Sequence, residues 1–231
     1  MKNILRICSF GVFVAVLGMS IKSFAAPAYG TKMPRKNAFN TGVQTYIVFD
    51  RELEDPFGEI NSEQYFALLS YGVTDWLSLD LKGGVGNIDQ MPGGGGEIHY
   101  PKFMGGGYGF RLKLFDDDKT AAVFGFQHIS IHPESVKING VKNKAVLDDW
   151  QWSLLASHQV GKITPYAGTK WSRMDYIHWV SDDRKRKQSD LGKSIGLITG
   201  VDISLTPETW VNLEGQFFDV EAFAASINVS F

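Results

Sequence analysis

The last eleven residues of the chain, Glu221 to Phe231, alternate strictly between two kinds of side chain. Successive side chains of a β-strand point to opposite faces of the sheet. One face of this segment would carry the apolar residues Phe223, Ala225, Ile227, Val229 and Phe231. The other would carry the small or polar residues Ala222, Ala224, Ser226, Asn228 and Ser230. The segment is therefore predicted to be a strand that separates an apolar environment from a polar one.

Similar amphipathic segments recur through the chain, at about the 9 to 11 residues that a tilted strand needs to cross a bilayer. We predict ten of them: 40–52, 63–73, 76–86, 103–115, 120–131, 149–160, 163–177, 194–205, 209–218 and 221–231. Tight connections alternate with long ones, as in bacterial barrels with short periplasmic turns and longer outer loops. The predicted fold is an all-β, transmembrane, antiparallel up-and-down β-barrel of about ten strands, with eight or twelve strands as the alternatives.

The first 25 residues have the pattern of a secretory signal peptide. Lys2 and Arg6 precede an apolar run from Ile7 to Met19, and Ser23-Phe24-Ala25 supplies small residues at a cleavage site. We therefore expect a signal peptide at 1–25, a periplasmic segment at 26–39 and the barrel at 40–231. The single cysteine, Cys8, lies in the signal. Consequently we expect no thiol chemistry in the mature chain.

The mature chain is mildly acidic. The full sequence has 23 Lys and Arg against 25 Asp and Glu, and the signal removes Lys2, Arg6 and Lys22, which leaves 20 − 25 = −5. This charge excludes the basic excess of a nucleic-acid-binding protein, so no nucleic acid is expected as a partner.

Strand pairing assigns several charged side chains to the barrel interior, because a charge facing lipid at mid-depth costs about 2 to 4 kcal/mol for Lys or Arg. Around the turn Gly161-Lys162, Trp152 should lie opposite Trp171; around Asp219-Val220, Phe217 should lie opposite Phe223 and Glu214 opposite Ser226. The predicted luminal charges are Asp80, Lys82, Arg111, Lys113, Lys170, Asp202 and Glu214. They are interpreted as a network of ion pairs that fills the barrel, with a narrow ion-lined conduit as the alternative.

A set of aromatic residues falls near the ends of the predicted strands, where amphipathic rings suit the membrane interface. The set comprises Trp76, Trp150, Trp152, Trp171, Trp210, Tyr108 and Tyr166. We interpret it as an interfacial girdle.

Other short motifs do not support a cofactor or a metal. Gly192-Lys193-Ser194 imitates the end of a phosphate-binding loop, but Lys187 stands where the upstream glycine belongs. His128 and His132 are four residues apart, a spacing that converges on a metal on a helix but not on a strand. The run Asp182 to Lys187 is predicted to be a solvated loop tip, with binding of lipopolysaccharide phosphates as the alternative.

Two short patterns resemble elements of outer-membrane enzymes. His128-Ile129-Ser130 resembles the His-x-Ser element of outer-membrane lipid A deacylases, and pairing sends both side chains outward. Ile131 replaces the asparagine that follows the serine in those enzymes, and Glu134 is the nearby acid. Ten-stranded omptin proteases carry acids and a histidine above the membrane, as Asp148, Asp149, Asp175 and His178 would if they gathered at the strand tops. The strands expected here are shorter than those of omptins. No catalytic residue is therefore predicted.

Three stretches resemble the small bacterial outer-membrane β-barrel superfamily that includes opacity-type and OmpA-like surface barrels. They are 71–79, 164–168 and the region from Gly200 to the terminal Phe231. The resemblance implies a place in the bacterial outer membrane, contact with its lipid and lipopolysaccharide, and recognition of Phe231 by the barrel-assembly machinery. It implies a structural or surface-interaction role through outer loops. A small porin-like channel is the alternative, and a lipid A-directed hydrolase is the third possibility. The sequence leaves the oligomeric state open.

Overall fold

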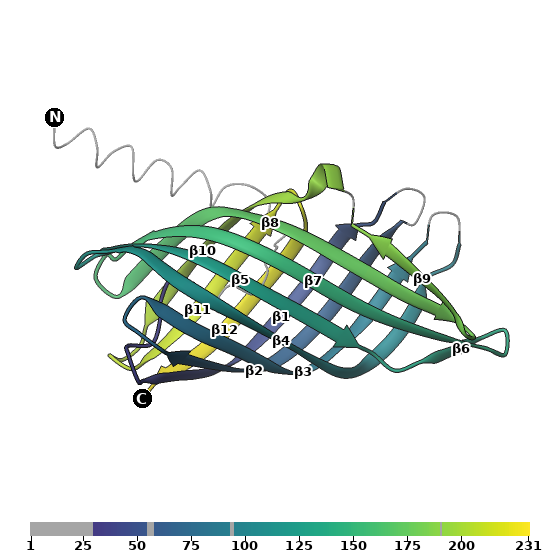
Figure 1. The fold of residues 1–231 in the computed structure, drawn as a ribbon, viewed down its shortest axis with the longest axis horizontal. Coiled ribbons are helices and arrows are strands. Elements are labelled where there is room, and N and C mark those ends of the chain that lie inside the picture. Colours follow the sequence, from purple (N-terminus) through teal and green to yellow (C-terminus); the bar gives the residue numbers. More distant parts are fainter. Residues whose placement is uncertain (1–29, 55–57, 93–94, 190) are drawn as a thin grey trace.

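A computed structural model describes residues 30–54, 58–92, 95–189 and 191–231. The expected signal peptide and residues 26–29 lie outside the described residues. Within them the chain is a closed, all-antiparallel barrel of ten strands, which confirms the predicted fold class and strand number. Figure 1 shows the strands running obliquely around a common axis. No helix in the described part of the chain is long and apolar enough to cross a membrane.

The barrel strands follow one another in sequence around the ring. They are β1 (Phe39–Glu52), β2 (Glu59–Gly72), β3 (Leu77–Met91), β4 (Ile98–Asp116), β5 (Thr120–His132), β7 (Val141–His158), β8 (Ile163–Val180), β10 (Ile195–Ser204), β11 (Thr209–Phe217) and β12 (Glu221–Ser230). Two short strands, β6 (Val136–Ile138) and β9 (Asp183–Gln188), pair with β7 and β8 beyond the ring, and a 3-10 turn, η1 (Leu191–Lys193), precedes β10.

The first and last strands close the barrel by pairing with each other. β1 and β12 are in register from Asn40 with Ser230 up to Val48 with Ala222. Backbone hydrogen bonds of 2.9 and 3.0 Å join Phe39 and Phe231, and their rings stack with centroids 6.1 Å apart. The terminal aromatic residue therefore lies at the seam. Both ends of the described chain lie at the end with the tight turns, which by the rule of bacterial barrels is the periplasmic end.

Several strands run further outward than the sequence pattern indicated. β4 has 19 residues, and β7 and β8 have 18 each, whereas 13, 12 and 15 were expected. The segments expected as loops at 87–102, 132–148 and 178–193 are thus partly strand. The additional residues form strand pairs above the apolar belt. Alternation of apolar and polar residues is not required there, so the sequence does not indicate these parts of the strands. The extensions project at the right-hand end of Figure 1.

The outer wall carries a belt of exposed apolar side chains that includes Val43, Leu69, Leu81, Tyr108, Leu154, Leu197 and Ile227. A soluble protein would bury such a belt, so this surface faces lipid. A strand tilted by about 40° climbs roughly 2.5 Å per residue. On β8 an apolar band about 25 Å tall that begins near Pro165 therefore covers about ten residues and ends near Asp175.

Two aromatic residues assigned to the interfacial girdle lie inside the barrel instead. Trp210 is 6% exposed and Tyr166 is 3% exposed, whereas Trp76, Trp152, Trp171 and Tyr108 are exposed on the outer wall. Tyr166 is four residues from Lys170 on the same strand, so the alternation of faces sends both side chains inward. The expectation was wrong because closeness to a strand end was given more weight than parity.

The last hairpin also differs in detail from the expected register. Asn212, not Glu214, lies opposite Ser226, and Gly215, not Phe217, lies opposite Phe223. The loop begins at Phe218, which adopts a φ of 79°, so it is longer than the two residues expected. The register is shifted by two residues, which leaves each side chain on the face that was expected. Glu214 therefore still points inward.

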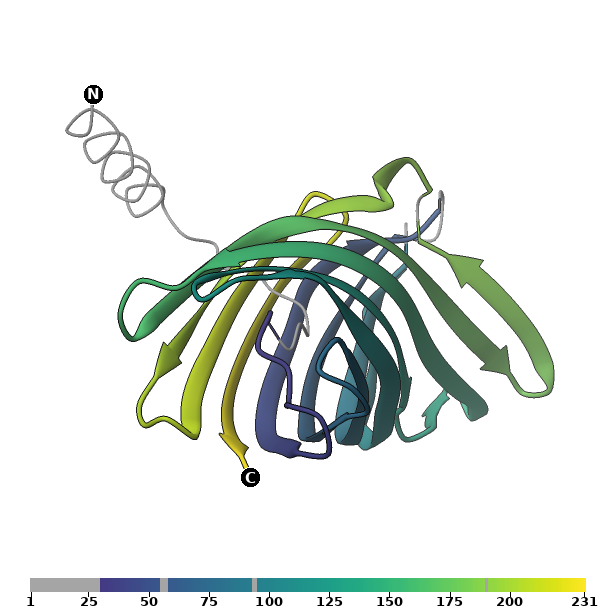
Figure 2. The same cartoon turned by 60° about the vertical axis from the view of Figure 1, so that its left-hand side comes forward.

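The segment before β1, residues 30–38, enters the periplasmic mouth of the barrel (purple in Figure 2). Thr31 is buried and donates a hydrogen bond of 2.7 Å to Ser157. Lys32 reaches Ser204 with its Nζ at 2.8 Å and lies 5.1 Å from the centroid of the Trp210 ring. The segment thus closes part of this mouth from within.

Candidate functional site

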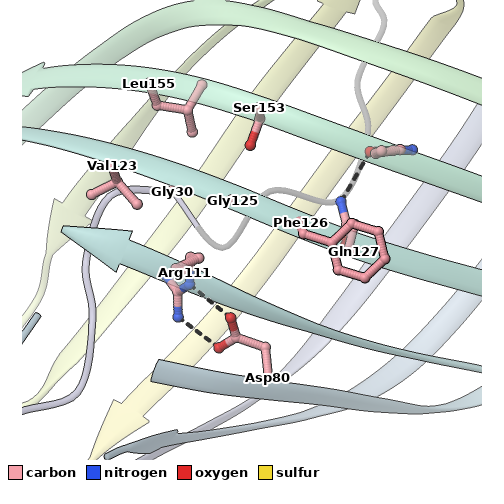
Figure 3. Close-up of a pocket in the computed structure, with 10 residues that line it drawn as sticks. Gly30, Asp80, Arg111, Val123, Gly125, Phe126, Gln127, Ser153 and Leu155 are labelled. Atoms are coloured by element: carbon pink, nitrogen blue, oxygen red, sulfur yellow. Dashed lines mark hydrogen bonds and ion pairs between the residues drawn. The ribbon is translucent and has the colours of Figure 1, made fainter. Parts of the chain in front are cut away.

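The inward face of the strands near the periplasmic end carries a bidentate ion pair. Arg111 on β4 donates from Nε and Nη2 to the two carboxylate oxygens of Asp80 on β3, both at 2.9 Å. Ser70 also contacts Asp80. Arg111 further donates from Nη1 to the backbone carbonyl of Lys32 at 2.7 Å. One side chain therefore joins the barrel wall to the N-terminal segment, beside the small cavity drawn in Figure 3.

A second polar group lies across the lumen on β8, β10 and β11. Tyr166 donates to Glu214 at 2.7 Å, and Asn212 donates to the hydroxyl of Tyr166 and to Asp202, both at 2.9 Å. Gly30 packs against this group, since a Cβ there would lie 2.9 Å from Asp202. The close approach explains why a residue without a side chain occupies position 30.

The third polar group is centred on Asp219 in the loop between β11 and β12. Its Oδ2 lies 3.1 Å from Nη1 of Arg51 and 2.9 Å from Nζ of Lys170. The same oxygen accepts a hydrogen bond of 2.6 Å from the hydroxyl of Ser172. The ionic side chains are at most 1% exposed. Asp219 was expected in the turn between the last two strands, but it folds back into the lumen. Two buried cations oppose its charge there.

The structure places six of the seven predicted luminal charges in the interior. Asp80, Lys82, Arg111, Lys170, Asp202 and Glu214 are buried. Lys113 is not part of the buried set. It lies at the periplasmic mouth and pairs with Asp116 at 2.7 Å, where the two side chains are 23% and 51% exposed.

The sequence interpretation missed Arg51, which is 1% exposed in the lumen. Strict alternation from Tyr46 and Val48 would send position 51 outward. A β-bulge between Val48 and Asp50 inserts a residue and reverses the parity above it. Bulges have no dependable sequence signature, so the omission follows from the local geometry.

An apolar layer crosses the lumen toward its extracellular end, which the sequence interpretation also missed. One contiguous cluster contains buried side chains from β1 to β5, β7 and β8, namely Tyr46, Ile60, Ile88, Tyr100, Ile131, Leu147, Met174 and Tyr176, together with Val220 of the last loop. Each is at most 4% exposed. Because side chains from opposite walls meet, this layer separates the polar half of the lumen from the extracellular side.

The cavities beside the ion pairs are small. The cavity between Arg111 and Gln127 has a volume of about 30 Å³, and one between Lys32 and Asn228 has about 10 Å³. A site for one water needs roughly 10 to 15 Å³, so these cavities suit single waters and not a solute path. A cavity of about 610 Å³ opens at the periplasmic mouth beside Lys32 and Trp210.

A separate polar cluster lies outside the lumen, on the outer wall of β5 and β7 just above the apolar belt. Ser130 contacts Asp148 at 2.5 Å and His132 Nε2 at 2.9 Å, and His128 Nε2 lies 3.6 Å from Asp148. The acid beside this serine is therefore Asp148, not Glu134 as expected. Burial raises the pKa of Asp148, but the neighbouring His128 and the hydrogen bond from Ser130 outweigh burial, and the pKa is lowered.

The four residues compared with omptins do not gather at one site. Asp149 is buried on the luminal face of β7. Asp148 and Asp175 are register partners on the outer face, while His178 contacts Asn143 on the luminal side at 3.0 Å. Consecutive strand residues point to opposite faces, so neighbours in sequence are separated by the wall. Among the described residues, no group of three or more His, Cys, Asp or Glu is placed to hold a metal ion.

No protein-family model and no curated protein matches this sequence. Solved structures with a similar fold include the attachment invasion locus protein Ail of Yersinia pestis, with 7% identity, a TM-score of 0.44 and coverage of 86% of this chain and 100% of that chain. The outer membrane protease OmpT of Escherichia coli has 10% identity, a TM-score of 0.44 and coverage of 87% and 99%. An outer membrane channel of Pseudomonas putida F1 has 8% identity, a TM-score of 0.45 and coverage of 89% and 99%. At these values the likeness carries no argument about activity.

Proposed function

We propose that the protein is an integral barrel of the bacterial outer membrane that does not conduct, and that it acts at the cell surface through its extracellular extensions. The observation that carries this proposal is the apolar layer across the lumen. Ions that pass such a layer lose their hydration without gaining polar partners. The role would match that of opacity-type and OmpA-like surface barrels, with Phe231 as the residue read by the assembly machinery.

The buried charges support the same proposal. Arg111 with Asp80, and Arg51 and Lys170 with Asp219, use their charged atoms on one another at distances of 2.9 to 3.1 Å. A conduit needs charged groups that exchange protein partners for permeant ions. Arg111 and Asp80 instead join the neighbouring strands β4 and β3, and Asp219 bridges Arg51 on β1 and Lys170 on β8. Both arrangements are structural.

The test is conductance of the refolded mature chain in planar bilayers. We expect no steady conductance steps from barrels that are folded by the criterion of heat-modifiable migration. A control with the apolar layer opened, Tyr46→Ala with Tyr176→Ala, should conduct and so shows that the assay detects an open lumen. Steady steps from the wild-type barrel would refute the proposal. In that case neutralising Lys170 or Arg111 should change ion selectivity.

A lipid-directed hydrolase is the second candidate, and one observation favours it. Ser130, His132 and Asp148 form a hydrogen-bonded cluster on the lipid-facing side of the wall, where ester-linked acyl chains have access. Ladder pairing of β5 with β4 and β7 occupies the backbone around Ser130, so an oxyanion would depend on side chains for stabilisation. The lowered pKa of Asp148 also makes it a weak base.

Release of fatty acid from lipid A measures this second function directly. Ser130→Ala and His132→Gln should abolish release, whereas His158→Gln, at the periplasmic end of β7, should leave it unchanged. If no release occurs with the wild-type barrel, or if Ser130→Ala retains it, the cluster has a structural role only.

A further inference from the structure

We propose that the outer wall of β7, β8 and β9, just above the apolar belt, is a binding site for the phosphate groups of lipopolysaccharide in the outer leaflet. The inference deepens the proposed surface role by naming the lipid class that one face of the barrel contacts. It rests on the barrel lying in the outer membrane, but not on whether the lumen conducts.

The site is built from arginines that a buried carboxylate holds side by side. Asp175 on β8, with a side chain 1% exposed, pairs with Arg186 on β9 and lies 3.5 Å from Nε of Arg173. The two arginines remain 47% and 34% exposed. Asp148, the register partner of Asp175, is a second carboxylate on this face. With Arg184 and Lys144 the face holds four cations against these two carboxylates, which leaves net positive charge, and arginine matches phosphate oxygens in a bidentate manner.

A third arginine extends the same face outward. Arg184 lies over the ring of Trp179, with its Cζ 5.5 Å from the ring centroid, and the two residues are register partners. Lys144 on β7 is the partner of Trp179 on the other side and is exposed. The Trp179 ring covers one face of the Arg184 guanidinium. The N–H groups at the edge of the guanidinium therefore stay accessible to a ligand.

The height of these residues matches the layer of lipid headgroups. The apolar band on β8 ends near Asp175 by the estimate of roughly 2.5 Å per residue. The backbone of Arg173 lies about 5 Å below that boundary, a distance that its long side chain can span toward the headgroups, and Arg186, opposite Ile177, lies about 5 Å above it. Arg184, opposite Trp179, lies about 10 Å above it. Cations at this depth face headgroup phosphates and not acyl chains.

Protection of the exposed edge of β9 is the competing explanation, because charged side chains on an edge strand prevent pairing with other chains. Edge protection depends on charge alone and does not require a particular lipid. The lipid site requires the phosphate groups. The two explanations therefore predict different results when the phosphates of the lipid are removed.

The experiment measures binding of labelled rough-type lipopolysaccharide to the refolded full mature chain in nanodiscs. Arg173→Gln with Arg184→Gln and Arg186→Gln should weaken binding by at least about tenfold, the loss of roughly 1.4 kcal/mol or more. The control Lys36→Gln, Lys119→Gln and Lys162→Gln removes the same charge at the exposed periplasmic end and should leave binding unchanged. Dephosphorylated lipopolysaccharide should bind the wild type no better than the intact lipid binds the arginine variant.

A second variant is needed because Arg186→Gln removes a partner of the buried Asp175 and could weaken binding through misfolding. Lys144→Gln with Arg184→Gln leaves the Asp175 pairs intact and should still weaken binding severalfold. Equal binding by the wild type and this variant would overturn the inference, as would equal binding of the dephosphorylated lipid. Binding of phosphatidylglycerol as tight as that of lipopolysaccharide, or full displacement by inorganic phosphate alone, would likewise overturn it. A conducting wild-type barrel would refute the proposed function without affecting this result.

Discussion

Replacing Asp219 by asparagine should be among the most destabilising changes that conserve shape in this barrel. The carboxylate pairs with Arg51 at 3.1 Å and with Lys170 at 2.9 Å, and it accepts a hydrogen bond of 2.6 Å from Ser172. The side chains of the three ionic groups are at most 1% exposed. Removing one partner of a buried ion pair costs about 3 to 5 kcal/mol, because the other charge stays buried without compensation. Here two cations lose the same partner, so we expect the upper part of that range.

Removing Lys170 should cost less than removing Asp219. Lys170→Met leaves Asp219 paired with Arg51 and hydrogen-bonded to Ser172, so the loss is one charged contact, about 2 kcal/mol. The double variant Lys170→Met with Asp219→Asn should be more stable than the sum of the single effects predicts, by about 1 to 3 kcal/mol.

Equilibrium unfolding in urea of the refolded barrel in detergent micelles, followed by tryptophan fluorescence, gives these free energies. Asp116→Asn is the matched control, since Asp116 also pairs with one lysine but at the exposed mouth. It should change the free energy of unfolding by no more than about 1 kcal/mol. A cost for Asp219→Asn as small as that of the control would refute the reasoning that the lumen at Asp219 is closed to water.

Three further changes test other parts of the structure. Gly84→Ala should cost at least about 2 kcal/mol in urea unfolding, because its Cβ would lie 1.8 Å from a backbone carbonyl of β2, whereas Gly83→Ala has free space and should be neutral. Burial and neighbouring carboxylates raise the pKa of Asp50, above the apolar belt, to about 6. The folded chain thus holds a proton that the unfolded chain loses near pH 4, and stability falls as pH rises through 4 to 6. Asp50→Asn should therefore stabilise the barrel by about 1 kcal/mol at pH 8, allowing for solvent screening, and not at pH 4. Arg111→Gln should free the N-terminal segment from the periplasmic mouth and speed its cleavage by added trypsin, while Lys113→Gln should not; equal rates would contradict the hydrogen bond to Lys32 as the anchor.

The sequence was sufficient for the barrel because lipid on one side and a narrow polar lumen on the other impose strict alternation. That constraint fixed the ten strands, and it fixed the pairing of Trp152 with Trp171. Above the membrane the constraint ends, and the outward extensions of β7 and β8 were expected to be loops. Arg51 was missed because the bulge in β1 reverses parity, and Asp219 because a loop residue has no parity at all.

The apolar residues of the lumen were harder to predict than its charged residues. Tyr46 and Tyr176 share the inward parity of charged residues, so alternation marks them as luminal, yet a polar lumen was expected and aromatic residues were assigned to the interface. Tyr100 lies in a segment expected to be a loop, beyond a register shift that reverses the parity of β4 relative to Arg111. The layer they help to form encloses the charges below it. Since an enclosed charge must be matched within the barrel, the lumen is electrically self-contained. The unbalanced charge is left to the rim, where the arginines of β8 and β9 lie on one side and the carboxylates around Asp50 and Glu59 on another. In a leaflet rich in phosphate these two sides should behave differently, and the arginine side is the one that attracts lipid headgroups.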